Sequence, residues 1–211
     1  MKNAIKTLVL SMLAGVCIAI GGTVFLSCES KVAGAVFFAT GLFFIVSYGL
    51  FLFTGKVGYL FDNKPKYLID LLLIALGNLA GTFLTGTLLR CTRVAGISER
   101  AAQLCEAKLS DTPQSILILS VFCGMLMFLA VDGYRTIQHS PGKYLAVILP
   151  VAVFILCGFE HCVANMYYFS VAGAWSLKAA EYMLLMILGN SIGGVFIPLM
   201  MKLAKRIDIE K

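Results

Sequence analysis

Charged residues divide this 211-residue chain into long apolar stretches, five of which contain no charge at all. A helix needs roughly 20 apolar residues to cross about 30 Å of hydrocarbon. The five stretches comprise residues 7–28, 32–55, 71–89, 112–131 and 182–201. A sixth apolar stretch, residues 144–177, has Glu160 and His161 in its middle, and we interpret it as an interrupted span. The pattern therefore predicts a chain that crosses a membrane six times.

The predicted spans leave no length for a soluble domain. They cover about residues 4–26, 33–54, 68–89, 114–134, 144–170 and 181–203, with short loops between them. Composition agrees, because 60% of the residues are hydrophobic and 13% are charged. That charged fraction is about half the average for a soluble domain, which excludes a soluble protein. We expect an all-α integral membrane protein in which residues 1–211 form a single transmembrane domain in a lipid bilayer.

The distribution of Lys and Arg predicts the orientation of the chain in the membrane. With six spans both termini lie on one side, and that side carries 11 of the 17 basic residues. We therefore expect cytoplasmic termini in a multi-pass protein of the inner, or plasma, membrane. The net charge of +6 has the same explanation. No basic run with interleaved aromatic residues indicates a nucleic-acid partner.

The N-terminus allows a second interpretation. Lys2 and Lys6 followed by an apolar run also describe a secretory signal peptide. The run is long for such a peptide, and the segment around Gly21 and Gly22 lacks a clear cleavage site. We favour a first membrane span.

The seven cysteines and two histidines give no metal-ligand spacing, so we expect neither a metal site nor a cofactor. Most of the cysteines lie inside predicted spans, where a free thiol packs like a small apolar side chain. Cys91 and Cys105 lie instead in the longest loop, on the predicted outer side. They can pair if that compartment is oxidising, and the sequence leaves this open.

A short motif recurs in the third and the sixth predicted span. Residues 77–81 and 189–193 both read GNxxG. Small residues four apart let helices approach closely, and a polar Asn at membrane depth needs a partner or water. Helix packing alone is one explanation of each motif, but the recurrence favours two inverted three-helix repeats. Glycines also interrupt the second helix of each half, which indicates irregular backbone lining a central cavity.

Three motifs together resemble the formate/nitrite transporter family. Residues 149–166, LPVAVFILCGFEHCVANM, are very similar to the signature of that family. Residues 52–55, LFTG, resemble the loop in its broken second helix, and residues 189–194, GNSIGG, resemble its sixth-helix motif. The resemblance covers all six spans.

The resemblance implies a homopentamer in which each protomer has its own pore and an aquaporin-like fold with broken helices two and five. Such proteins conduct small monovalent anions of weak acids, among them formate, nitrite and hydrosulfide. By resemblance, Phe154 forms an outer apolar constriction and Leu42 with Phe38 an inner one. The residues implied along the substrate pathway are Thr54, His161, Lys143, Asn165 and Asn190. Those implied in the broken-helix motifs are Leu52, Phe53, Gly158 and Glu160.

The chemistry of these side chains suits an anion pathway. An unpaired anion in a narrow apolar pore costs many kcal/mol, so the pore must attract the anion and neutralise it. Lys143 can raise the local anion concentration, although it is also explained as a topology-determining lysine with no role in the pore. His161 can hydrogen-bond the anion or give it a proton, and Thr54 can donate a hydroxyl hydrogen bond. Glu160 points away from its neighbour on a helix, so we expect a structural acceptor.

We therefore predict a channel or transporter for small monovalent anions of weak acids, with formate as the first candidate. Proton coupling at the central histidine is left open. Nitrite and hydrosulfide are alternatives, because they share the charge and approximate size of formate. A water or neutral-solute channel is less favoured, because the paired Asn-Pro-Ala motif is missing from the sequence. We do not expect an enzyme, since no second carboxylate, nucleophile or metal set accompanies Glu160 and His161.

Overall fold

The structure, a computed structural model, describes residues 2–209, and every regular element among them is helical. The elements are α1 (Lys2–Ser27), α2 (Lys31–Ser47), α3 (Phe53–Lys56), the 3₁₀ helix η1 (Val57–Asp62), α4 (Tyr67–Leu89), α5 (Ile97–Ser110), α6 (Pro113–Thr136), α7 (Ser140–Cys157), α8 (Cys162–Ala172) and α9 (Leu177–Ile209). Within the described range, α1, α4, α6, α7 and α9 are long and apolar enough to cross a membrane, and α2 is apolar but shorter. The predicted all-helical class with several apolar helices is confirmed. The count of six spans stays a prediction.

Two of the predicted spans are interrupted. The predicted span 33–54 contains most of α2, a non-helical segment at 48–52 and the start of α3. The predicted span 144–170 contains α7, a break at 158–161 and most of α8. Both interruptions contain a glycine with positive φ at or next to their first residue, 66° at Gly49 and 70° at Gly158. Glycine ends a helix in this left-handed conformation without the steric cost of a Cβ atom.

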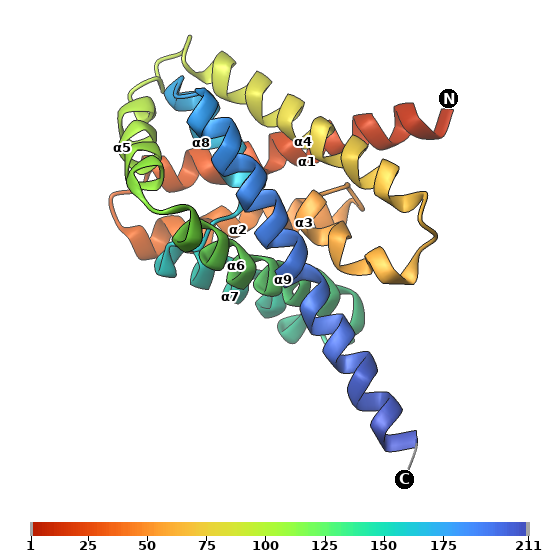
Figure 1. Cartoon of the computed structure of the whole chain (residues 1–211). Coiled ribbons are helices and arrows are strands. Elements are labelled where there is room, and N and C mark those ends of the chain that lie inside the picture. Colours follow the sequence, from red (N-terminus) through yellow and green to blue (C-terminus); the bar gives the residue numbers. More distant parts are fainter. Residues whose placement is uncertain (1, 210–211) are drawn as a thin grey trace.

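Two helix pairs form the densest contacts in the molecule. Helix α1 packs most extensively on α4, and α6 packs most extensively on α9. Figure 1 shows the long blue helix α9 running from the top of the view to the bottom and crossing α6, while α1 and α4, in red and yellow, lie together in the upper half. Gly81 of α4 faces the carbonyl oxygen of Met12, and Gly193 of α9 faces the carbonyl oxygen of Val121. A Cβ atom at either glycine would overlap the facing backbone, so these two contacts need glycine.

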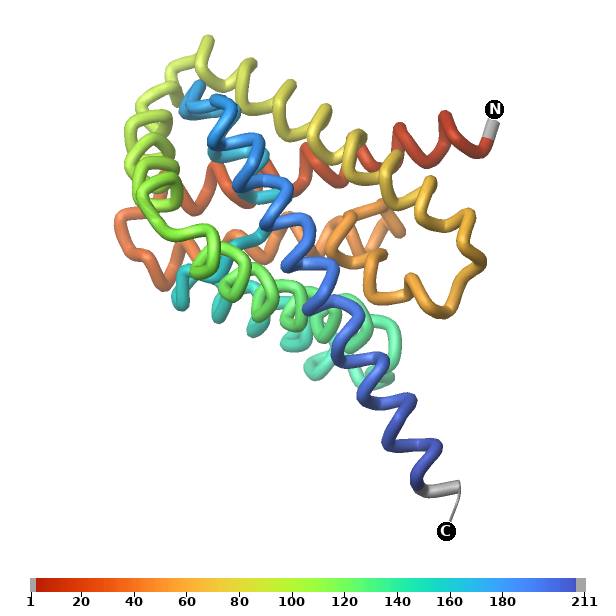
Figure 2. The backbone as a smooth tube through the Cα atoms, in the orientation of Figure 1, coloured from red at the N-terminus to blue at the C-terminus, as the bar shows by residue number. Residues whose placement is uncertain are grey.

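The segment between α2 and α4 forms a loop at one end of the molecule and contains α3 and η1 (Figure 2). The Tyr67 hydroxyl donates a hydrogen bond to the carbonyl oxygen of Lys56 at 3.1 Å. An ion pair between Lys202 and Asp62 joins α9 to η1. These contacts hold the loop against the end of the bundle.

Helix α5 lies in the region 90–113 that the sequence analysis treated as a loop. It buries Ile97, Ala101 and Cys105 and packs on α8. The thiols of Cys91 and Cys105 are both free, the first exposed and the second buried. Burial raises the pKa of Cys105 to about 12, which keeps it in the unreactive thiol form. The structure therefore does not contain the disulfide that the sequence left open.

Many large apolar side chains remain exposed on the outer faces of the helices. Leu72 of α4 is 66% exposed and Leu184 of α9 is 68% exposed. Contiguous exposed apolar surface of this kind is unusual for a soluble monomer. Lipid or neighbouring copies of the chain must cover it.

The close contact of α6 with α9 predicts a strong effect of a single methyl group. We expect Gly193→Ala to lower the free energy of unfolding by about 1–3 kcal/mol or more, because the facing backbone at Val121 cannot move aside like a side chain. The measurement is the thermal unfolding midpoint of the protein in detergent. Gly96→Ala is the matched control, since nothing lies within 4 Å of a Cβ atom there. Equal midpoints for the two variants would contradict this packing.

Candidate functional site

A buried asparagine on α4 pairs the backbone of the first interruption. Asn78 Oδ1 accepts a hydrogen bond from the backbone N–H of Phe53 at 2.8 Å. Its Nδ2 donates to the carbonyl oxygens of Ser11 at 2.8 Å and Phe51 at 2.9 Å. One side chain therefore connects α1, the non-helical segment and the start of α3. It supplies partners for backbone groups that have lost their helical ones.

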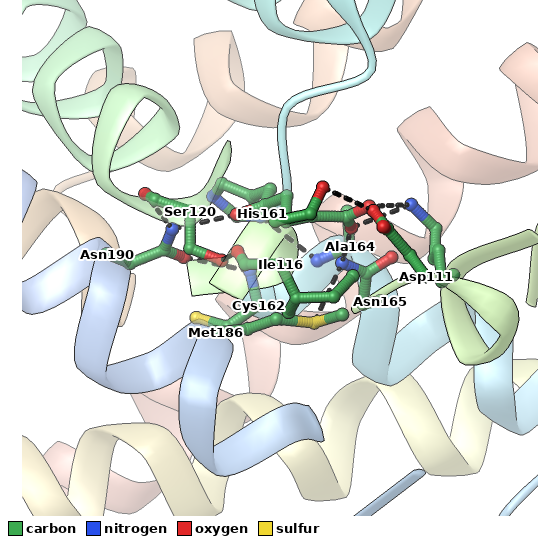
Figure 3. Close-up of polar contacts among 12 residues, drawn as sticks. Asp111, Ile116, Ser120, His161, Cys162, Ala164, Asn165, Met186 and Asn190 are labelled. Carbon is green, nitrogen blue, oxygen red and sulfur yellow. Dashed lines mark hydrogen bonds and ion pairs between the residues drawn. The ribbon is translucent and has the colours of Figure 1, made fainter. Parts of the chain in front are cut away.

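Asn190 on α9 pairs the backbone of the second interruption. Its Oδ1 accepts a hydrogen bond from the backbone N–H of Cys162 at 2.9 Å. Its Nδ2 donates to the carbonyl oxygens of Ser120 and Glu160, both at 2.8 Å. Figure 3 shows Asn190 beside Ser120 and Cys162 with these bonds dashed. The sequence analysis expected Asn190 to support the central site, and its side chain pairs the backbone next to His161.

The two sets of contacts correspond along the chain. The asparagines are 112 positions apart, and each pair of their partners is 109 positions apart: Ser11 and Ser120, Phe51 and Glu160, Phe53 and Cys162. The positive-φ glycines, Gly49 and Gly158, are also 109 apart. Both asparagines come from the GNxxG motifs. The same polar arrangement therefore occurs once in each half of the chain.

Thr54 and His161 meet where the two interruptions come together. Thr54 Oγ1 lies 2.9 Å from His161 Nε2. His161 caps α8, and its Nδ1 accepts the backbone N–H of Ala164 at 3.0 Å. Because Nδ1 acts as an acceptor, a neutral ring carries its hydrogen on Nε2. The Nε2–H group then donates a hydrogen bond to the threonine oxygen. Thr54 is fully buried and His161 is 1% exposed.

One phenylalanine ring stacks on His161, and a second ring packs against the first. The ring of Phe154 stacks on the His161 ring with centroids 5.5 Å apart. Phe38 meets Phe154 edge to face at 5.7 Å. The sequence analysis grouped Phe38 with Leu42 in a separate constriction. Phe38 and Phe154 form one apolar layer through this contact, and Leu42 lies buried one helical turn further along α2. The two implied constrictions stay a prediction.

The carboxylate of Glu160 is buried in the second interruption and paired. Lys108 of α5 donates to its two oxygens at 2.9 and 2.7 Å, and the side chains are 14% and 5% exposed. Asn165 Nδ2 donates to Glu160 Oε2 at 2.7 Å and to Met186 Sδ at 3.1 Å. Glu160 is thus an acceptor in the break, and Asn165 contacts Glu160 rather than His161. Figure 3 shows Asn165 close to Met186.

Lys108 is the residue that sequence reasoning missed. The sequence analysis gave it no role, because nothing in the sequence places α5 over the break. The available signal was Glu160 itself, since a carboxylate at membrane depth needs a cation or several donors. The described residues contain no group of three or more His, Cys, Asp and Glu side chains that could hold a metal ion.

A cavity of about 520 Å³ opens next to the first interruption. Leu52 and Gly55, which flank the pair Phe53 and Thr54, line its inner part. Lys143, the lysine implied beside the pore, also lines it, and its Nζ lies 4.4 Å from the centre of the Tyr134 ring. The cavity therefore connects this lysine with the segment that carries Thr54.

The comparisons with known proteins agree with these features. The sequence model of a family described as Formate/nitrite transporter matches residues 1–204. Formate channel FocB of Escherichia coli (strain K12) is 27% identical over 188 residues, which are 79% of this chain and 66% of FocB. Uncharacterized transporter YrhG of Bacillus subtilis (strain 168) is 30% identical over 186 residues, 81% of this chain and 70% of YrhG. The chain thus spans about two thirds of the length of these relatives.

Two solved structures have the same fold. A pentameric formate channel with formate bound superposes with a TM-score of 0.77 at 25% identity and covers 97% of this chain and 98% of that one. An FNT family ion channel superposes with a TM-score of 0.80 at 23% identity and covers 93% and 88%. These neighbours are channels, and none of the proteins named here is described as an enzyme.

The buried ion pair predicts a specific pattern of stabilities. Lys108→Met leaves the Glu160 carboxylate buried without its cation, and we expect it to lower the free energy of unfolding by about 3–5 kcal/mol. The double variant Lys108→Met/Glu160→Gln should recover most of that loss, because no buried charge then remains. Unfolding in detergent measures both, with the exposed Lys205→Met as control. An equal loss in the single and double variants would show that the ion pair is not the cause.

Proposed function

Because this chain belongs to the formate/nitrite transporter family, we propose that it conducts small monovalent anions of weak acids, with formate as its principal substrate. The observation that carries the proposal is the Thr54–His161 pair, buried beside the Phe154 ring at the meeting of two helix interruptions. The printed names of FocB and of the formate-bound channel support formate as the first choice. Nitrite and hydrosulfide carry the same single charge and are the alternative substrates of the same site.

We propose that the substrate meets Thr54 first from the cavity side. The Nε2–H group of a neutral His161 donates a hydrogen bond to the Thr54 oxygen, so the hydroxyl hydrogen of Thr54 is free to point toward an anion. A hydrogen bond to a charged group contributes about 1.5–3 kcal/mol. It offsets part of the cost of removing the anion from water.

The apolar layer of Phe38 and Phe154 then decides which species passes. A charged anion between the two rings has no hydrogen-bond donor, whereas a neutral weak acid crosses with a far smaller desolvation cost. We propose that His161 supplies or relays the proton that makes the acid neutral. Flux should therefore depend on pH in the range where the supply of protons changes.

We further propose the assembly and topology implied by the resemblance: a homopentamer of protomers with six spans in two inverted repeats, both termini in the cytoplasm and the whole in the inner membrane. The duplicated Asn78 and Asn190 contacts support two related halves. The exposed apolar faces of α4 and α9 support lipid and subunit contacts. The name of the pentameric formate channel supports the subunit number.

His161→Asn should remove the ring that orients Thr54 and carries the proton. We expect formate uptake into proteoliposomes to fall roughly 10- to 100-fold, because the loss of one hydrogen bond to a charged group has an effect of this size. The remaining uptake should no longer depend on pH. His139→Asn is the control, because His139 is exposed and only caps α7, and Asn caps equally well. Parallel uptake of nitrite, hydrosulfide, lactate and a neutral solute ranks the substrates. The proposal is refuted if His161→Asn takes up formate as fast as the wild type and with the same pH dependence. It is also refuted if only neutral solutes pass.

Phe154→Ala should open the apolar layer by removing one of its two rings. We expect lactate, which is larger than formate, to gain uptake relative to formate, because the space between α2 and α7 widens. The ratio of lactate to formate uptake measures this effect. Phe37→Ala on the exposed face of α2 is the control. An unchanged ratio in Phe154→Ala would mean that the ring does not limit passage.

A further inference from the structure

The cavity of about 520 Å³ beside the first interruption is lined by three basic side chains, Lys56, Arg135 and Lys143. They come from α3, α6 and α7, and Lys56 is distant in sequence from Arg135 and Lys143. None of the three forms a salt bridge among the described residues, whose ion pairs are Lys108–Glu160 and Lys202–Asp62. No carboxylate among the described residues therefore forms an ion pair with any of these three side chains.

Each of the three cations lies over an aromatic ring instead. Lys56 Nζ is 4.6 Å from the centre of the Phe51 ring. Arg135 Cζ is 4.8 Å from the centre of the Tyr59 ring, and Lys143 stacks on Tyr134 as described above. A ring stabilises a cation but leaves its charge and its N–H donors available to a ligand.

One carboxylate beside this group, that of Asp132, already has a partner. Asp132 accepts a hydrogen bond from the Tyr59 hydroxyl at 3.0 Å and does not line the cavity. Burial and the neighbouring Arg135 lower the pKa of Lys56, which indicates that these two cations repel each other across the cavity. A bound anion would relieve that repulsion.

The size of the cavity and its position decide which anion fits. A volume of about 520 Å³ is in the range of small-molecule sites, roughly 300–1,000 Å³. A monovalent anion neutralises only one of the three positive charges. An anion with two or more charges can bridge them, and it cannot cross the Phe38–Phe154 layer because it cannot be made neutral by one proton.

We propose that this cavity is a binding site for a small anion with two or more negative charges, and that its occupant blocks access to Thr54. Leu52 and Gly55 line the inner end of the cavity, so a bound anion lies across the route to Thr54. The ligand chemistry is a pair of anionic groups, as in a dicarboxylate or a diphosphate. The blocking effect rests on the proposed function, whereas the binding itself does not.

Inorganic pyrophosphate is the probe, added to the detergent-solubilised protein and followed by calorimetry against sodium chloride of equal ionic strength. We expect pyrophosphate to bind the wild type saturably. It should bind Arg135→Gln and Lys143→Gln at least about tenfold more weakly, because each variant loses a charge-assisted hydrogen bond. Lys64→Gln, at an exposed position outside the cavity, is the control and should bind as the wild type does. No binding to the wild type, or equal binding by Arg135→Gln and Lys143→Gln, would overturn the site.

The same probe in proteoliposomes tests the block. We expect pyrophosphate to inhibit formate uptake when it reaches the cavity face, and not when it is present on the other face only. Binding without any formate uptake in its absence would refute the proposed function and leave the site intact. If pyrophosphate reduces formate uptake from neither face, the proposed blocking effect is wrong, while the binding site stands.

Discussion

The fold depends on one constraint, which is that backbone N–H and C=O groups away from water need partners. In a membrane each unpaired group costs several kcal/mol, so a helix cannot simply stop. This chain stops two helices, at Gly49 and Gly158, and compensates with Asn78 and Asn190. Each asparagine pairs one N–H and two carbonyl groups. These hydrogen bonds lower the free-energy cost of the two interruptions.

The site follows from those interruptions. A continuous helix would bury the backbone and present only apolar side chains to the interior, whereas a break brings the capping residue of the next helix inward. His161 caps α8 in this way and reaches Thr54 at the start of α3. The Lys108–Glu160 ion pair adds a second support to the same break from outside the helix pairs. The Thr54–His161 pair and the Lys108–Glu160 pair thus both lie at the second interruption.

The sequence predicted the apolar helices well, because the positions of charges directly record what must stay out of lipid. The GNxxG motifs also identified both asparagines before their partners were known. Where the sequence analysis failed, the answer depended on long-range packing. Helix α5 packs on α8, and Lys108 pairs with Glu160, through contacts between distant segments. Periodicity and local motifs hold no information on such contacts.

The central claim is that Thr54 and His161 act as one anion site. A double-mutant cycle on formate uptake tests it most directly, with Thr54→Val, His161→Asn and the double variant measured in the same proteoliposomes. If the two side chains work as one unit, the double variant loses no more uptake than the more impaired single variant. If the two losses multiply, the residues act independently and the account of the site is wrong.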